Sequence, residues 1–229
     1  MRLRRIIPGH LLTIVSALFM AVALVFTFLI APREAVMGDV QRIFYFHVAA
    51  AWTGYLALVV AFLASVLCLT RGPGRWDGLA LSSVEIGLVF VTEGIVSGSI
   101  WAKAAWGVWW TWDPRLTTSA VLWLIYASYL TLRKAVQEES RRARIAAVYA
   151  VMGFAAVPIN FMAIRWWRTV HPVVLESSGL HLGPTMLATL VLSVVAFTLL
   201  YFTLLRLRLR LQDAGDRIES LMRCPGGVS

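Results

Sequence analysis

Charged residues are scarce in this chain. Asp, Glu, Lys and Arg make up 14% of its 229 residues, whereas hydrophobic residues make up 59%. A soluble domain of this length needs far more charge on its surface, so the composition excludes an ordinary soluble globular protein. It indicates a polytopic membrane protein instead, and the predicted fold class is all-α.

Acidic residues are the scarcer of the two charged classes, with 12 Asp and Glu against 21 Lys and Arg. In a soluble protein the resulting net charge of +9 would suggest a nucleic acid partner. Here the basic residues cluster beside apolar runs, which indicates membrane topology and contact with anionic lipid headgroups. We therefore expect the lipid bilayer, and no nucleic acid, as the partner of these charges.

Cysteine is almost absent, with only Cys68 and Cys224, far apart in the chain. Neither belongs to a C-x-x-C or C-x-x-C-H pattern, which excludes a thiol relay and a covalent haem attachment site. The chain also lacks a G-x-x-x-x-G-K-[ST] phosphate-binding loop, so any use of ATP must come from a partner.

Long apolar runs, by contrast, are abundant. The first is near 20 residues, enough to cross about 30 Å of hydrocarbon and longer than a signal-peptide core, so we expect an uncleaved helix. Pro158 is expected to kink the fifth run. The runs predict six transmembrane helices in a single integral membrane domain, residues 1–229, at about 11–31, 48–70, 79–100, 118–132, 145–164 and 184–205.

The distribution of basic residues predicts the orientation of these helices. Six spans place both termini on one side of the membrane, and 15 of the 21 basic residues fall on that side. Because cytoplasmic segments carry the excess of Lys and Arg, both termini should be cytoplasmic. The loops that hold His47, His171 and the segment between the third and fourth helices then face the periplasm of a bacterial inner membrane.

That segment, Trp101–Thr117, has the most unusual composition in the chain. Five of the ten tryptophans lie in its first twelve residues, followed by Asp113 and Arg115. An aromatic belt at the membrane–water boundary is one explanation, because tryptophan is enriched there. A belt accounts for one or two tryptophans per helix end, so a flat apolar platform for a large planar ligand is the alternative that we favour.

Two histidines and several arginines are predicted to share the membrane face of this segment. Imidazole is an axial ligand of haem iron, indole rings pack on a porphyrin, and arginine pairs with carboxylates such as the propionates. His47 and His171 are therefore candidate ligands on opposite faces of one haem.

Each of these residues also has a structural explanation. A lone histidine at a membrane interface is more often a hydrogen-bonding surface residue, which is how we interpret His10 and His181. Arg42 and Arg115 would also serve as anchors of helix ends. Carboxylates inside a span are costly, so Glu85 and Glu93 are candidates either for a functional site or for a polar contact between helices.

The central segment carries a resemblance to a known family. Its residues 106–117 read W-G-V-W-W-T-W-D-P-R-L-T, which resembles the W-G-x-x-W-x-W-D-x-R-L-T signature of the haem-handling WWD family of cytochrome c biogenesis. Residues 42–48, R-I-F-Y-F-H-V, and residues 166–171, W-W-R-T-V-H, are similar to the histidine-containing segments of its CcmC branch. Val170 replaces a leucine of that pattern. The resemblance covers nearly the whole chain.

The resemblance implies a function and a set of site residues. Members of the CcmC branch hold haem at the outer membrane face and help to load it onto the haem chaperone CcmE. They work with the ABC-type subunits CcmA and CcmB and with CcmD. The implied cofactor is haem b, with His47 and His171 as iron ligands and the remaining site residues as the surrounding platform: Arg42, Trp106, Trp109, Trp110, Trp112, Asp113 and Arg115.

We therefore expect a haem-delivery subunit rather than an enzyme. The alternatives are a transporter subunit that moves haem across the membrane, a CcsA-like delivery subunit, and an assembly subunit with no ligand.

Overall fold

The computed structural model describes residues 9–172 and 182–223, and every regular element in these ranges is helical. His181 and Cys224, discussed above, lie outside the described residues. The helices, with one π-helical and one 3-10 turn, are α1 (Gly9–Val25), η2 (Phe26–Ile30), η3 (Asp39–Arg42), α2 (Ile43–Arg71), α3 (Gly74–Trp106), α4 (Pro114–Ala135), α5 (Glu139–Gly153), α6 (Ala156–Trp166) and α7 (Pro184–Arg223).

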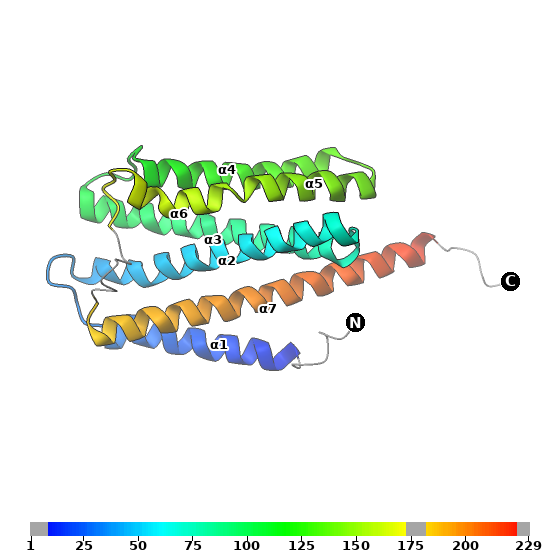
Figure 1. Cartoon of the computed structure of the whole chain (residues 1–229). Coiled ribbons are helices and arrows are strands. Elements are labelled where there is room, and N and C mark those ends of the chain that lie inside the picture. The colour runs from blue at the N-terminus through cyan, green and yellow to red at the C-terminus, as the bar shows by residue number, and fades with distance from the viewer. Residues whose placement is uncertain (1–8, 173–181, 224–229) are drawn as a thin grey trace.

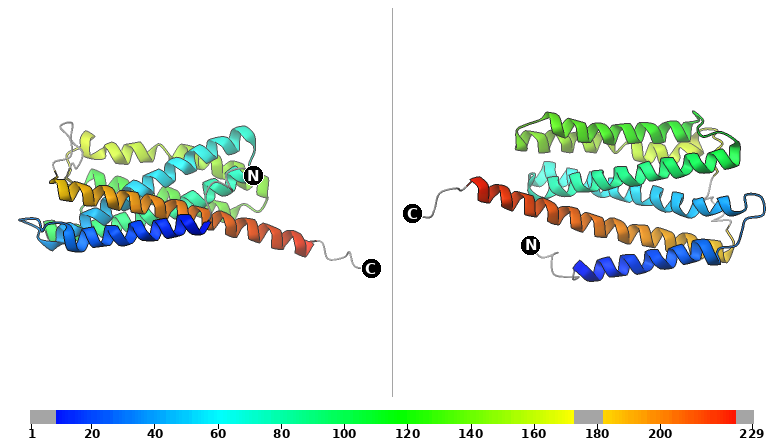
Figure 2. Two further views of the ribbon diagram at one scale, coloured as in Figure 1. Left: turned by 90° about the horizontal axis from the view of Figure 1, so that it is seen from below. Right: turned by 180° about the vertical axis from the view of Figure 1, so that it is seen from behind.

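The helices form an elongated bundle of three layers (Figures 1 and 2). α1 lies beside α7, α2 and α3 form the middle layer, and α4 packs with α5 and α6 on the far side. Both described ends of the chain, at the start of α1 and the end of α7, lie toward one end of the bundle, the termini end (Figure 1). At the opposite end, the loop end, lie residues 31–42, 107–113 and 167–172.

Five helical segments in the described residues are long and apolar enough to cross a membrane: His10–Ile30, Asp39–Arg71, Gly74–Trp106, Glu139–Trp166 and Pro184–Met222. They cover five of the six predicted spans. The remaining predicted span, the fourth in chain order at 118–132, lies within α4, which is helical and 22 residues long but less apolar than the others. The all-helical membrane fold is thus confirmed, whereas the number of spans stays a prediction.

Glycines allow the two middle helices to approach closely. A Cβ atom on Gly54 of α2 would lie 3.0 Å from Cγ2 of Val91, and one on Gly87 of α3 would lie 3.0 Å from Cβ of Ala57. Small residues favour helix association in a bilayer because they bring backbones together. The α2–α3 pair also contacts both outer layers, so it forms the core of the bundle.

The third helix is longer than its predicted span, 79–100. α3 continues to Trp106, so Trp101 and Trp106 lie on a helix rather than in a loop. The helix ends at Gly107, whose φ of 77° is the left-handed conformation typical of a residue that follows a helix. The Lys103 ammonium donates to the Gly107 carbonyl and helps to close this last turn.

The predicted kink at Pro158 is confirmed as a break between α5 and α6. The break falls at Phe154 and Ala155, and Phe154 is the residue four positions before Pro158. Pro158 has no N–H to donate to the Phe154 carbonyl, and its ring clashes with that carbonyl. The regular helix therefore cannot continue through this turn. Residues 133–144, a charged segment between the fourth and fifth predicted spans, are helical apart from Val136–Glu138.

The last helix extends much further than its predicted span, 184–205. α7 has 40 residues and runs to Arg223, so the polar segment that follows the last predicted span is mostly helical. Arg208 on this extension pairs with Glu85 of α3, with Nε 2.7 Å from Oε2. Glu85 therefore makes a polar contact between helices. The Oε2 atom of Glu93 is buried without a partner among the described residues.

A second ion pair joins α3 to α4 at the termini end. The Arg133 guanidinium donates to both carboxylate oxygens of Asp77, at 2.5 and 2.7 Å. The Arg133 side chain is 8% exposed and that of Asp77 17%. A buried charge whose partner is removed is strongly destabilising, because it remains desolvated.

We expect Asp77→Asn to lower the free energy of unfolding by about 3 kcal/mol, since it leaves the Arg133 charge buried without its partner. The measurement is thermal unfolding of the purified protein in detergent. Arg33→Gln is the control, because Arg33 belongs to an exposed pair with Asp39 whose loss costs less than about 1 kcal/mol. Equal effects of the two substitutions would contradict this account of the pair.

Candidate functional site

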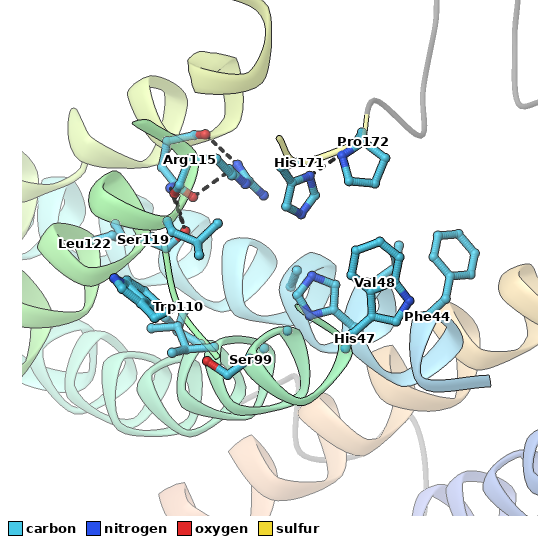
Figure 3. A pocket seen from close by; sticks show the side chains of 18 of the residues that line it. Phe44, His47, Val48, Ser99, Trp110, Arg115, Ser119, Leu122, His171 and Pro172 are labelled. Carbon is cyan, nitrogen blue, oxygen red and sulfur yellow. Dashed lines mark hydrogen bonds between the residues drawn. The ribbon is translucent and has the colours of Figure 1, made fainter. Parts of the chain in front are cut away.

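A cavity opens at the loop end of the bundle among α2, α3, α4, α6 and the segment after α6 (Figure 3). The unfilled space between its walls is about 970 Å³, including the part that is open to solvent. The cavity brings together residues that are far apart in the sequence, among them His47, Arg115 and His171.

The two histidine rings lie close together at this cavity. Their centroids are 6.2 Å apart, and their planes are inclined by 39°. A metal–imidazole bond is about 2 Å long, and the centroid lies about 1 Å beyond the nitrogen, so one metal ion between two rings separates their centroids by about 6 Å. The spacing thus matches that of two axial ligands on one iron. Figure 3 shows both rings directed into the same space.

The hydrogen bond of His171 determines which of its nitrogens is available. Its Nδ1 lies 3.0 Å from the carbonyl oxygen of Pro172. A carbonyl only accepts, so Nδ1 carries the proton and the Nε2 lone pair is free to bind a metal. Nδ1 of His47 lies 3.2 Å from Oγ of Ser97 in α3.

The environment of His171 also keeps its ring neutral. Burial is the main cause that lowers the pKa of His171, to about 4, and the nearby positive charge of Arg115 adds to it. His47 lowers this pKa further, while the Pro172 carbonyl and Asp113 act in the opposite direction. Only a neutral imidazole binds a metal, so the ring is ready to act as a ligand at neutral pH.

Arg115 is held at the cavity wall by Asn160 of α6. Its Nη1 donates to the Asn160 carbonyl oxygen at 2.5 Å and to the side-chain oxygen at 3.3 Å. That side-chain oxygen also accepts from the Tyr55 hydroxyl of α2, and the Asn160 amide donates to Thr118 and Ser119 of α4. Asn160 is 1% exposed, so this buried amide links three helices around the base of the arginine.

The tryptophans divide into two groups. Trp101, Trp106 and Trp110 line the cavity, and Trp101 packs edge-on against Trp106 with centroids 5.3 Å apart. Trp109 and Trp112 are 58% and 79% exposed and do not line it. The segment therefore supplies one wall of the cavity and, separately, an exposed aromatic surface at its edge.

One atom in the wall of the cavity indicates that the ligand has a polar group. The indole nitrogen Nε1 of Trp110 is buried and has no hydrogen-bond acceptor among the described residues. A buried N–H without an acceptor is costly, so such groups in proteins usually have a partner. A ligand with an acceptor atom, such as a carboxylate, would supply one.

Asp113 serves the local structure of the segment. It caps the first turn of α4: its Oδ1 accepts from the backbone N–H of Leu116 at 3.0 Å, and its Oδ2 accepts from the Thr111 hydroxyl at 3.3 Å. Pro114 follows at the first helical position, where its missing N–H costs nothing. Among the described residues the hydrogen bonds of Arg115 go to Asn160 rather than to Asp113, so the arginine is available to face the cavity.

Arg42 lies outside the walls of the cavity. Its Nη1 donates to the Phe28 carbonyl at 2.6 Å and its Nη2 pairs with Asp39 at 3.1 Å. These bonds tie the end of the first span to the start of α2. His47 lies on the next turn of that helix. His10 lies at the start of α1, which begins at the termini end.

Asn160, Tyr55 and Ser97 were not predicted as site residues. The signal for Asn160 was present, because an amide inside an otherwise apolar span usually bonds to a neighbouring helix. Tyr55 and Ser97 gave no such signal, since hydroxyl-bearing residues are common throughout these helices. Their roles depend on which helices are neighbours, and this emerges only in three dimensions.

Comparison with known proteins identifies the family of the chain. Residues 3–222 match the family model described as "Heme exporter protein C", or CcmC. The chain belongs to the CcmC family. The resemblance to the CcmC branch inferred from the tryptophan and histidine segments is therefore confirmed, and with it a role in haem handling for cytochrome c maturation.

Several CcmC relatives are similar over most of their length. "Heme exporter protein C" of Bradyrhizobium diazoefficiens is 33% identical over 194 residues, which cover 84% of this chain and 74% of the relative. The protein of the same name from Escherichia coli K12 is 33% identical over 204 residues, or 87% and 81% of the two chains. That of Rhodobacter capsulatus is 31% identical over 205 residues, or 86% and 83%.

The residues of this CcmC-family cavity fit haem. The two imidazoles have the spacing of axial ligands, the indole rings provide apolar walls, and Arg115 and the Trp110 N–H provide partners for a carboxylate. All of these groups come from this one chain.

We expect Asn160→Ala to weaken both the fold and the site. The substitution leaves Tyr55 and Arg115 without their shared acceptor, which costs about 2 kcal/mol in the free energy of unfolding. Arg115 keeps its bond to the backbone carbonyl of residue 160 but loses the side-chain acceptor, so it should be held less firmly and the purified protein should retain less haem. Thermal unfolding and the haem-to-protein absorbance ratio measure the two effects.

Thr131→Ala is the matched control, because within the part of the chain that the structure describes the Thr131 hydroxyl bonds to the Ala127 carbonyl of its own helix and to no other helix. If Asn160→Ala behaved like this control in both measurements, Asn160 would not support the site.

Proposed function

We propose that this chain binds haem b at the loop end of its bundle and presents it for transfer to the haem chaperone CcmE. The observation that carries the proposal is the 6.2 Å separation of the His47 and His171 rings, which matches two ligands on one iron. Haem supplies an iron centre with two open axial positions and a planar apolar ring with carboxylate side chains.

The proposal assigns a role to each group of residues around the ring. His47 and His171 donate their Nε2 lone pairs to the iron. Trp106 and Trp110 pack on the porphyrin, since offset or edge-on contacts between aromatic surfaces are favourable. Arg115 pairs with a propionate through its planar guanidinium. Each of these residues lines the cavity.

The remaining predicted site residues lie around this core. Trp109 and Trp112 are exposed at the rim, where we propose that they cover the ligand or contact the chaperone. Asp113 fixes the start of α4 and thereby the position of Arg115. Arg42 fixes the start of α2 and thereby that of His47. Asp113 and Arg42 thus affect ligand binding through the positions of Arg115 and His47.

We also propose a membrane topology with six spans. α4 is the fourth of the six spans, because its 22 residues have a length of about 33 Å and it packs against α3 and α6. The whole chain, residues 1–229, is then a single domain in the bacterial inner membrane. Both termini are cytoplasmic and the loop end faces the periplasm, as the excess of basic residues near the termini suggests.

We further propose that the chain works in a complex with CcmA, CcmB and CcmD. The sequence has no phosphate-binding loop, so ATP hydrolysis would belong to the ABC-type subunits. The chain itself would bind and release haem without changing its covalent structure, and it would not act as an enzyme.

Replacement of either axial histidine tests the haem site. We expect six-coordinate, low-spin haem in the wild-type absorption spectrum. His47→Ala and His171→Ala should each free one axial position and shift the spectrum toward high spin. Added imidazole should reverse the shift, because it occupies the open position.

His10→Ala is the control, since His10 lies at the start of α1 rather than at the cavity, and it should leave the spectrum unchanged. A wild-type spectrum that neither His47→Ala nor His171→Ala alters would rule out these two residues as ligands.

Thiol labelling tests the topology. In a chain with Cys68 and Cys224 replaced by Ser, Val36→Cys places a thiol at the loop end, at a position that is 90% exposed. Gly215→Cys places one on the exposed end of α7. A membrane-impermeant maleimide should label position 36 in intact spheroplasts, and position 215 only after lysis. The opposite pattern would place the site on the cytoplasmic side.

A further inference from the structure

The ring of His47 rests against the backbone of α3. A Cβ atom on Gly98 would lie 2.8 Å from Cε1 and 3.2 Å from Nδ1 of His47. Real Cβ atoms essentially never show contacts under 3.0 Å, so a side chain at position 98 would force a shift, and the nearest atoms that would have to move belong to the imidazole ring. Only glycine at position 98 leaves room for the ring in this position.

The neighbouring serine is a hydrogen-bond partner of the same ring. Ser97 Oγ lies 3.2 Å from Nδ1 of His47 and 3.3 Å from the carbonyl oxygen of Gly94. The carbonyl only accepts, so the single hydroxyl hydrogen of Ser97 goes to Gly94. The oxygen of Ser97 then accepts from Nδ1–H of His47, which leaves the Nε2 lone pair free.

We infer that Ser97 and Gly98 are positioning residues for His47: together they fix its ring position and its tautomer so that Nε2 faces the cavity. The consequence for haem rests on the proposed function. Metal-binding histidines are generally oriented in this way by a hydrogen bond to the other ring nitrogen, and loss of that bond weakens metal binding about 10–100-fold.

The two histidines are oriented by different elements. The acceptor for Nδ1 of His171 is the carbonyl of the next residue, Pro172, whereas the acceptor for His47 comes from another helix. Substitutions in α3 should therefore affect His47 and leave the tautomer of His171 unchanged.

The tautomer is measurable without haem. In protein labelled with ¹⁵N-histidine, the Nδ1 and Nε2 chemical shifts report which nitrogen carries the proton, and His47→Ala identifies the signals of residue 47. We expect the Nδ1–H form in the wild type and in Ser97→Thr, which keeps the hydroxyl. Ser97→Ala should give a mixture of both tautomers. A wild-type His47 in the Nε2–H form, or no change in Ser97→Ala, would overturn the inference.

The haem-loaded protein gives a second readout. We expect haem to dissociate about tenfold faster from Ser97→Ala than from the wild type, with Ser97→Thr close to the wild type. Gly98→Ala should displace the ring, raise the high-spin fraction, and respond to added imidazole as His47→Ala does. Ser193→Ala is the matched control, because the one hydrogen bond of this buried α7 serine among residues 9–172 and 182–223 goes to Thr189 of its own helix.

The outcomes separate this inference from the proposed function. If His47→Ala changes the haem spectrum but Ser97→Ala and Gly98→Ala do not, the positioning roles are wrong and the ligand assignment stands. If His47→Ala leaves the spectrum unchanged, the proposed ligand itself is wrong, whatever the ¹⁵N shifts show.

A second feature lies at the termini end, independent of the haem site. A groove between α1 and α7 contains about 690 Å³ of unfilled space, including the part open to solvent. Its basic side chains among the described residues are His10, Arg206 and Arg210. Arg206 and Arg210 are four residues apart and therefore share one face of α7.

The apolar members of the groove face outward. Ile14 and Leu207 are 60% and 44% exposed, next to the basic group on the same two helices. A basic cluster beside exposed apolar side chains, at the end of two membrane-spanning helices, matches the headgroup and acyl chain of one lipid. The geometry points to a site for an anionic phospholipid, with its phosphate at Arg206 and Arg210 and its acyl chain along Ile14 and Leu207.

Thermal unfolding in an uncharged detergent tests this site. Phosphatidylglycerol should raise the Tm of the wild type by about 3 °C relative to phosphatidylcholine, because it binds only the folded state. The Arg206→Gln/Arg210→Gln variant should lose this difference. Arg141→Gln/Arg142→Gln removes the same charge from α5 outside the groove and should keep it.

Three outcomes would overturn the lipid site. One is an equal response of the two double variants to phosphatidylglycerol. Another is the absence of any difference between the two lipids in the wild type. The third is an equal rise in Tm with inorganic phosphate, which would indicate an ion site without an acyl-chain contact.

Discussion

The close packing of α2 against α3 is the constraint on which the rest of the structure depends. The contact is tight at Gly54 and Gly87, and it ends at Gly98, which faces the ring of His47. Hydrophobic burial does not drive helices together in a bilayer, so close backbone packing has to do so. Both outer layers pack on this pair, and the position of His47 relative to the cavity follows from the spacing of the two helices.

The bilayer also determines where polar groups lie along the bundle. Hydrocarbon tolerates few unpaired polar side chains, so the ion pairs of Arg133 and Arg208 lie toward the termini end. The arginine of the cavity is held by Asn160 at the loop end. The middle of the bundle is packed mainly by alanine, leucine, valine and aromatic side chains. A polar ligand site is therefore confined to an end, where water and partner proteins have access.

Much of this was predictable from the sequence because it depends on local patterns. Apolar length predicted where the spans lie, and Pro158 predicted the break between α5 and α6. The convergence of His47, His171 and Arg115 followed from assigning alternate loops to one end of the bundle. The haem-handling family followed from the spacing of the tryptophans, Asp113 and Arg115.

Other features depend on contacts between helices and were missed. The continuation of α3 to Trp106 was missed because aromatic and polar residues at a membrane boundary are compatible with either a loop or a helix end. The predicted single platform is in fact a wall of three tryptophans and an exposed pair, Trp109 and Trp112. The network of Asn160, Tyr55 and Arg115 joins three helices, and no periodicity within a single helix encodes it.

The most direct test of the account is the number of histidine nitrogens bound to the iron. Electron–nuclear double resonance on the ferric, haem-loaded protein, prepared with ¹⁵N-histidine and unlabelled haem, detects ¹⁵N couplings only from histidine ligands. We expect couplings from two equivalent axial imidazoles, reduced to one in His47→Ala and to one in His171→Ala. A single coupled imidazole in the wild type, or two that persist in either variant, would contradict the claim that these two residues together bind one haem.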